Sequence, residues 1–309
     1  MGEDGSDWKA PRRIDTGSGR SHRRWLLTTP KDRATPKDRD AAMLDSATID
    51  SLARAYHIAE KERRRTRAPS VLHPGFTTED AYAVQRAWIK IKLGEGNVIK
   101  GHKIGLTSRA MQRASAINEP DYGSLMEDMF YETGQEIPMS RFIQPRLECE
   151  LGFVMGQRLR GPNCTIFDVL NAVDYVVPAA EIVDGRTHRI DPETNQPRCV
   201  LDSIADNAGN AALIVGGRPI RPMEMDLRWV GVLCHRNNVI EESGVAAAVL
   251  NHPANGVAWL ANKLAPFDIA LEPGQFVLGG SFTATVEAHA GDTFLVDYGT
   301  LGTITTRFV

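Results

Sequence analysis

The stretch PRLECELGFVMG, residues 145–156, places Glu148 and Glu150 in a run of residues that is otherwise mostly apolar. A short apolar run that ends at glycine is typical of a buried β-strand. Because successive side chains of a strand point to opposite faces, the two glutamates share one face, with Cα atoms about 6.5–7 Å apart. Two carboxylates on one partly buried face repel each other and are costly to remove from water.

A cation bound between the two glutamates would remove both costs, and ligands that offer only oxygen select Mg²⁺ or Mn²⁺ rather than Zn²⁺. The alternative is that the pair lies on the solvent face of an amphipathic strand. A third carboxylate, Glu181, lies in DYVVPAAEIVDG, residues 174–185, within an apolar run that should be interior. Three glutamates from two strands would fill half of an octahedral shell and leave room for water and substrate. The alternative for Glu181 is an ion pair with Arg146 or Arg186.

A lysine, an aspartate and a glycine-rich stretch add candidate site residues. Lys103 lies in KGHKIGLTS, residues 100–108, where Gly101 and Gly105 would let the backbone approach a ligand closely. A desolvated lysine near a dication has a lowered pKa and can move protons near neutral pH. Asp121 is expected in a loop, where turn formation is the alternative role. GGSFT, residues 279–283, offers backbone N–H groups and the hydroxyls of Ser281 and Thr283 to a carboxylate, or is simply a turn between strands.

The flanking sequence predicts an α+β fold. Helical patterns cover residues 47–65 and a second segment that starts after Thr77 and Thr78 and ends at Gly94 to Gly96. From residue 101 onward, short apolar runs alternate with Gly, Pro and Asp, which is typical of a β-rich domain. A helix is expected at 251–266, capped by Asn251 or His252, and a hairpin that turns between Gly299 and Gly302. We therefore expect a helical part, 43–100, and a β-rich catalytic domain, 101–309.

Residues 1–42 differ from the rest, because they hold ten Lys and Arg, seven Asp and Glu, and few apolar residues. Such a segment cannot bury enough surface to offset its ordering entropy. We expect a disordered extension, with Met43 as the start of the folded protein.

The composition excludes several classes of function. The net charge of −3 and the pI near 6.3 give no reason to expect a nucleic acid or an anionic membrane as partner. No apolar run approaches the roughly 20 residues that span a bilayer, and neither GxGxxG after a first strand nor GxxxxGK[ST] is present. Four cysteines with no CxxC pair argue against a zinc knot and a disulfide framework and predict a cytoplasmic protein.

Several long motifs resemble the hydratase/decarboxylase branch of the fumarylacetoacetate hydrolase superfamily. They are GHKIGLTSRAMQ, EPDYGSLMEDMF, PRLECELGFVMG, VVPAAEIVDGR, NHPANGVAWLANKLAP and LGGSFT. The resemblance covers residues 43–309. It implies a mixed β-sandwich or roll with an N-terminal helical part, and homo-oligomers built from pentamers, up to decamers. It also implies Mg²⁺, or Mn²⁺, bound by Glu148, Glu150 and Glu181, with Lys103 and Asp121 in the active site.

The activity implied by the resemblance is the metal-dependent addition of water to a seven-carbon 2-oxo or 2-hydroxy dienoic diacid in the degradation of aromatic compounds. A decarboxylase of 2-oxo-3-hexenedioate, a hydratase of the five-carbon 2-hydroxypenta-2,4-dienoate, and a non-catalytic subunit stay open as alternatives. The group that binds the distal carboxylate also stays open among Arg109, Arg146, Arg186 and His188. We expect Arg186, with Ser281 and Thr283, to bind substrate.

Overall fold

The computed structural model describes residues 43–309, which belong to one compact unit. The extension expected at 1–42 lies outside the described residues. No helix within 43–309 is long and apolar enough to cross a membrane.

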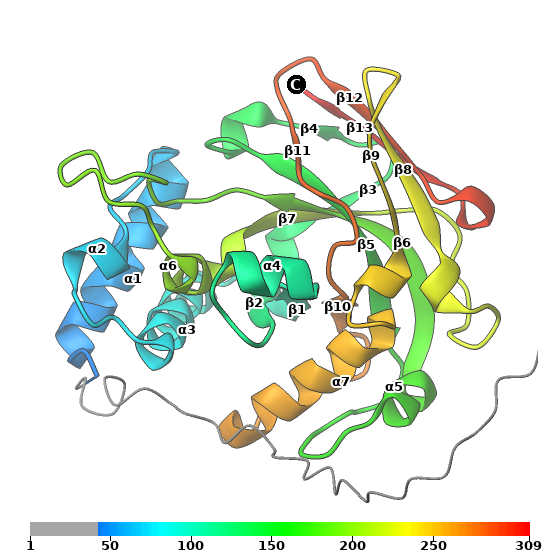
Figure 1. Ribbon diagram of the computed structural model, residues 1–309, viewed down its shortest axis with the longest axis horizontal. Helices are drawn as coiled ribbons and strands as arrows, with labels where there is room; N and C mark the ends of the chain where they lie inside the picture. Colours follow the sequence, from blue (N-terminus) through cyan, green and yellow to red (C-terminus); the bar gives the residue numbers. More distant parts are fainter. Residues whose placement is uncertain (1–42) are drawn as a thin grey trace, which may run out of the picture. The chain divides into compact units, whose positions relative to one another are not determined.

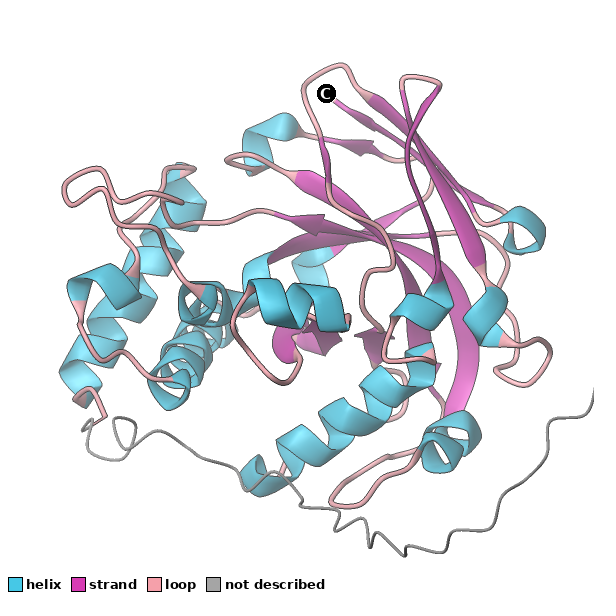
Figure 2. Ribbon diagram, in the orientation of Figure 1, coloured by secondary structure: helices cyan, strands magenta, loops and turns pink. Residues whose placement is uncertain are grey.

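The α-helices of the described chain lie beside and around the sheets (Figure 2), and four of the seven come before residue 115. They are α1 (Ser46–Glu62), α2 (Pro69–Leu72), α3 (Thr78–Gly94), α4 (Arg109–Ala114), α5 (Ile166–Ala172), α6 (Val200–Ala205) and α7 (Pro253–Leu264). The strands begin after α3. They are β1 (Ile99–Gly105), β2 (Asp121–Met126), β3 (Phe130–Glu132), β4 (Glu136–Ile137), β5 (Arg146–Met155), β6 (Val173–Val183), β7 (Asn210–Val215), β8 (Gly231–Arg236), β9 (Val239–Val245), β10 (Phe276–Leu278), β11 (Val286–Glu287), β12 (Thr293–Asp297) and β13 (Thr303–Phe308).

The first two long helices pack against each other, with the short helix α6 beside them (Figure 1). Helix α3 begins at a capping box, in which Thr77 and Asp80 each bond the backbone of the other. The rings of Tyr56 on α1 and Trp88 on α3 stack with centroids 5.7 Å apart. Both predicted helices are confirmed. They could be predicted because capping residues and an apolar face mark them in the sequence.

The strands of the described chain form two sheets. The larger runs β2-β1-β10-β5-β6-β7-β3, with β11 paired to β5, and the smaller runs β4-β13-β12-β8-β9. One continuous core joins them, since residues of both sheets and of the helices belong to the same buried cluster. The long strands β5 and β6 pair antiparallel over almost their whole length. This pairing fixes which side chains meet at the centre of the larger sheet.

The later part of the chain confirms two predictions and corrects one. His252 caps α7, because its Nδ1 accepts a hydrogen bond from the Ala254 N–H at 3.1 Å, and β12 and β13 form the C-terminal hairpin. Asp121, expected in a loop, is instead the first residue of β2, which is buried along its whole length. The strand was not predicted because Gly123 interrupts its apolar pattern. Glycine is needed there since a Cβ would lie 2.5 Å from the Asn207 carbonyl oxygen.

Candidate active site

The three predicted glutamates meet at the centre of the larger sheet. Glu148 on β5 lies directly opposite Glu181 on β6, and Glu150 follows two residues later on β5. One carboxylate oxygen of each lies within 4.8 Å of the others. Glu150 and Glu181 are buried and Glu148 is half-buried. The glutamates of β5 are therefore not on a solvent-exposed face of an amphipathic strand.

Glu181 is held by groups other than the arginines considered from the sequence. Its Oε1 accepts a hydrogen bond from Asn210 Nδ2 at 2.8 Å and lies 3.4 Å from Lys103 Nζ. Arg146 instead pairs with Glu287, and Arg186 with Asp206. Asn210 was not singled out from the sequence, although its position directly before the apolar run of β7 is a signal for a buried polar side chain.

Glu150 is held by the glycine-rich stretch 279–283. The backbone N–H of Gly280 donates to Glu150 Oε2 at 2.8 Å. Gly280 has φ +113°, and a Cβ on it would lie 2.5 Å from the side chain of Thr107, so only glycine fits. The stretch thus binds a carboxylate through its backbone, as expected of it, but this carboxylate belongs to the protein.

The hydroxyls of the same stretch line the cavity beside Glu148 and also bond to the backbone. Ser281 Oγ donates to the Thr283 carbonyl at 3.0 Å, and Thr283 Oγ1 accepts from the Cys149 N–H at 3.2 Å. These bonds fix the stretch against β5.

Lys103 and Asp121 face the glutamates from the neighbouring strands β1 and β2. Gly105, opposite Asp121 in the pairing, has no side chain in the space that Asp121 fills: a Cβ there would lie 2.2 Å from Asp121 Oδ1 and 3.1 Å from Lys103 Nζ. Gly101 serves the sheet rather than a ligand, because a Cβ there would overlap the Phe276 backbone of β10. Gly105 therefore makes room for Asp121 beside Lys103, while close approach of either glycine to a ligand stays a prediction.

Burial and charge shift the pKa of each group. Burial, reinforced by the charge of Glu181, raises the pKa of Glu148 to about 7 and that of Glu150 well above its ordinary value. Burial also raises the pKa of Asp121 to about 6, against the effect of Lys103. Burial alone would lower the pKa of Lys103, as the sequence suggested, but the surrounding carboxylates, Glu181 first, raise it above its ordinary value. In the protein without a cation, Lys103 is therefore protonated.

The carboxylates have the properties of a site for a hard dication. Within residues 43–309, the buried atoms Glu150 Oε1, Glu181 Oε2 and Asp121 Oδ1 have no hydrogen-bond partner. Buried polar atoms in native proteins are rarely left without one. The converging donors are all oxygen, which fits Mg²⁺, Mn²⁺ or Ca²⁺ better than Zn²⁺.

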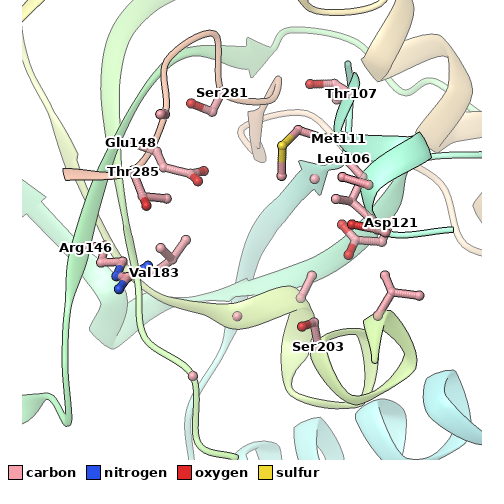
Figure 3. A pocket seen from close by; sticks show the side chains of 18 of the residues that line it. Leu106, Thr107, Met111, Asp121, Arg146, Glu148, Val183, Ser203, Ser281 and Thr285 are labelled. Atoms are coloured by element: carbon pink, nitrogen blue, oxygen red, sulfur yellow. The ribbon is translucent and has the colours of Figure 1, made fainter. Parts of the chain in front are cut away.

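A cavity of about 950 Å³ opens beside this group (Figure 3). Glu148 and Arg146 reach it from one side, and Asp121 faces them across it. The volume is ample for a small diacid.

The structure does not bring Arg186 to this cavity. The Arg186 side chain is 2% exposed, and its guanidinium donates to Asp206, Glu60 and the backbone carbonyls of Asp184 and Asn210. These four bonds hold the helical part against the sheet, so the geometry gives its expected substrate-binding role no support. Neither Arg109 nor His188 is among the described residues that line the cavity.

Three arginines that were not singled out do line the cavity: Arg65, Arg189 and Arg198. Two of them lie in the irregular segment between β6 and α6, where no periodicity indicates the direction of a side chain. The abundance of arginine after β6 is the feature of the sequence that could have indicated a cationic side of the cavity.

Comparison with known proteins gives a consistent result. The family model described as fumarylacetoacetate (FAA) hydrolase C-terminal matches residues 97–309. A 2-oxo-hept-4-ene-1,7-dioate hydratase of Escherichia coli is 61% identical over 267 residues, which is 86% of this chain and all of that protein. A 2-keto-4-pentenoate hydratase of Paraburkholderia xenovorans is 36% identical over 235 residues, covering 76% of this chain and 85% of the relative.

Among solved structures, 4-oxalocrotonate decarboxylase from Pseudomonas putida G7, complexed with magnesium and adipate, superposes with a TM-score of 0.82. It is 35% identical, and the match covers 86% of this chain and 99% of that chain. A second structure of the decarboxylase holds calcium and acetate, with a TM-score of 0.81.

Proposed function

Because the chain belongs to the fumarylacetoacetate hydrolase family, we propose that it is a Mg²⁺-dependent hydratase of 2-oxohept-4-ene-1,7-dioate, acting in the breakdown of aromatic compounds. The α+β fold with an N-terminal helical part, expected from the sequence, is the fold of this family. The observation that supports the reaction most is the high identity to the Escherichia coli hydratase over its whole length. The product would be 4-hydroxy-2-oxoheptanedioate.

We assign the metal to the three glutamates Glu148, Glu150 and Glu181. Their oxygens converge, two of them lack a hydrogen-bond partner, and a related decarboxylase is known as a magnesium complex. Bound Mg²⁺ supplies a Lewis acid that stabilises negative charge on the 2-oxo oxygen of the substrate.

Lys103 and Asp121 are the groups that move protons. Lys103 is protonated and donates, and Asp121, with its pKa raised to about 6 by burial, can accept a proton near neutral pH. As the dienol substrate becomes the conjugated 2-oxo-3-enoate, O2 loses a proton and C5 gains one. Water then adds its hydroxyl at C4 and a proton at C3. Ser281 and Thr283, whose hydroxyls line the cavity, lie where they can orient the bound acid.

Decarboxylation of a six-carbon 2-oxo diacid is the second candidate. The relative that was solved with magnesium is a 4-oxalocrotonate decarboxylase, and it shares the fold. The greater identity to the hydratase supports water addition. A non-catalytic subunit finds no support, because the carboxylates, Lys103 and Asp121 are all in place at one cavity.

The proposal includes a homo-oligomer built from pentamers, up to a decamer, working in the cytoplasm. Self-association is supported by exposed apolar side chains of the smaller sheet, Leu233, Val245 and Leu295, and by exposed Trp229 in the turn before β8. The four cysteines are free thiols, as is usual in a reducing compartment. Light scattering of the purified protein would give the number of subunits.

The deciding experiment is product analysis by NMR. The purified protein is incubated with Mg²⁺ and freshly generated 2-hydroxyhepta-2,4-dienedioate, with the five-carbon 2-hydroxypenta-2,4-dienoate and 2-oxohex-3-enedioate in parallel, each with an EDTA control. An EDTA-sensitive 4-hydroxy-2-oxo product, formed fastest from the seven-carbon diacid, supports the proposal. Release of CO₂ from the hexenedioate without hydration of the other two compounds would replace it with the decarboxylase.

A further inference from the structure

The active-site cavity carries two opposite kinds of charge. Besides the carboxylates of Glu148 and Asp121, four arginines line it: Arg65, Arg146, Arg189 and Arg198. None of the four forms an ion pair with Glu148, Glu150 or Glu181: Lys103 is the cation paired with Glu181, and Arg146 pairs with Glu287. The arginines therefore do not serve to neutralise that cluster.

Arg189 lacks a partner of its own. Within residues 43–309 its guanidinium makes no hydrogen bond and no ion pair, although Arg65 donates to Gln144 at 2.7 Å and Arg198 to Thr187 at 3.1 Å. Arg189 is exposed to solvent. Desolvation and the charges of Arg146, Arg198 and Arg65 lower its pKa, and Glu287 opposes them. Several like charges around an unpaired cation create a positive potential that favours an anionic ligand.

The carboxylates nearest to these arginines are already occupied. Asp184 accepts hydrogen bonds from the backbone N–H groups of Ile143 and Gln144, at 2.6 and 2.9 Å, and Asp206 is paired with Arg186. Glu287 pairs with Arg146 from the exposed end of β11. Of the described carboxylates, none lies within ion-pair distance of the Arg189 guanidinium, and Glu287, whose charge acts on the Arg189 pKa, pairs with Arg146.

The spacing of Arg146 and Glu148 along β5 is comparable with the length of a seven-carbon diacid. Arg146 and Glu148 are alternate residues of β5, so both side chains point to the cavity face, as Figure 3 shows, with Cα atoms about 6.5–7 Å apart. Six C–C bonds of about 1.5 Å, in a zigzag chain, separate the terminal carboxyl carbons by roughly 7–8 Å. A diacid with its C1 end at the metal cluster can therefore present its C7 carboxylate to the arginines, whereas a five-carbon monoacid has no group there.

We propose that Arg189 and Arg146 bind the distal carboxylate of the substrate and make the enzyme select diacids. The inference rests on the proposed hydratase function. A guanidinium bonds a carboxylate through two parallel N–H donors, which gives both affinity and orientation. Arg65 and Arg198 add to the positive potential while their own hydrogen bonds hold them in place.

The test compares two substrates on matched variants. Arg189→Gln should lower kcat/KM for 2-hydroxyhepta-2,4-dienedioate by about ten- to hundredfold, mainly through KM, because a charged hydrogen-bonded pair is lost. The same variant should hydrate 2-hydroxypenta-2,4-dienoate within about twofold of the wild type, since that substrate never used the guanidinium. Arg146→Gln should act in the same direction, and Arg189→Lys should recover part of the loss. The control is Arg158→Gln, whose side chain is exposed and pairs with Glu272.

Equal losses on the two substrates, or no loss on either, would overturn the inference, as would a wild-type preference for the monoacid. If the wild type hydrates neither compound, the hydratase proposal fails separately. The arginines are then judged by calorimetry with Mg²⁺ and the saturated probes 2-oxoheptanedioate and 2-oxopentanoate. Weaker binding by Arg189→Gln of the diacid alone supports the subsite, and equal binding of each probe by variant and wild type rules it out.

Discussion

Glu148 and Glu181 lie directly opposite each other on the antiparallel strands β5 and β6. Like charges in this position destabilise a sheet, and here Glu150 adds a third carboxylate within 4.8 Å while Lys103 offers one positive charge. Without a cation, the repulsion is limited because the pKa of Glu148 is raised to about 7 and that of Glu150 well above its ordinary value, so protons stay bound. A divalent cation would take the place of these protons, which is why we expect metal binding, stability and activity to change together.

Glu148→Gln should abolish Mg²⁺-dependent turnover and leave the fold intact. The substitution removes one ligand charge but keeps the shape of the side chain, so activity should fall by about a hundredfold or more, given that Lewis-acid stabilisation is worth several kcal/mol. Mg²⁺ affinity by calorimetry and the melting temperature in EDTA are the measurements. Glu272→Gln, on an exposed pair far in sequence from β5, is the matched control. Full activity of metal-free Glu148→Gln would refute the metal assignment.

Stability without metal should decline as the pH rises. The pKa of Glu148 is raised in the folded protein from 4.5 to about 7. A carboxyl whose folded pKa is raised binds its proton more tightly in the native state. The contribution of Glu148 to the free energy of unfolding is therefore complete below about pH 4.5 and is lost as the pH rises through about 7.

Mg²⁺ should consequently raise the melting temperature more at about pH 8 than at about pH 5.5, because it binds the ionised carboxylates. Scanning calorimetry in EDTA and in Mg²⁺ across this range is the measurement. In Glu148→Gln the EDTA profile should be flatter. A Mg²⁺ effect that is independent of pH would contradict this account.

The convergence of the three glutamates could be predicted from the sequence because it depends on regular structure. Strand alternation alone puts Glu148 and Glu150 on one face, and the apolar neighbours of Glu181 mark it as interior. What the sequence could not give is the partner of each group. Asn210 and Lys103 reach Glu181 through pairing between strands that are distant along the chain.

The arginines that follow β6 show more clearly why the sequence alone does not identify the substrate-binding side chains. Arg186 and Arg189 are three residues apart in one irregular segment, yet the first is buried under the helices and the second lines the cavity. No periodicity determines the direction of a side chain there, so a choice between the two arginines has no basis in the sequence. The same holds for β2, whose glycine and flanking proline resemble a loop but whose residues are all buried.

Lys103→Met should lower turnover without loss of metal binding. Removing the proton donor should reduce kcat by about 10²–10⁴-fold, as is usual for general acid–base groups. Mg²⁺ affinity should be kept or rise, because a positive charge 3.4 Å from Glu181 is gone. Lys100→Met is the control, since Lys100 lies on the same strand but is exposed and pairs with Glu127. If Lys103→Met loses metal instead, the role of Lys103 is to hold the cluster.

Gly105→Ala should impair catalysis through Asp121. The new Cβ would lie 2.2 Å from Asp121 Oδ1, so the carboxylate must move away from Lys103. We expect kcat to fall by about tenfold or more, since small displacements of catalytic groups are costly. Gly94→Ala is the control, because a Cβ there meets nothing within 4 Å. Kinetics of both variants, with a melting temperature for each, would separate misplacement of Asp121 from unfolding; unchanged kcat would mean that the position of Asp121 is unimportant.

Arg186→Met should destabilise the fold rather than change substrate preference. It removes the partner of the buried carboxylate of Asp206 and the half-buried one of Glu60, and breaking a buried ion pair from one side costs about 3–5 kcal/mol. Urea unfolding measures the loss. The control is Arg228→Met, which removes one half of the exposed Arg228–Asp226 pair and should leave the urea midpoint nearly unchanged. Folded Arg186→Met should keep the wild-type ratio of kcat/KM for the seven-carbon and five-carbon substrates, because its guanidinium does not reach the cavity. A stable variant with a changed ratio would restore Arg186 to the substrate site and weaken the case for Arg189.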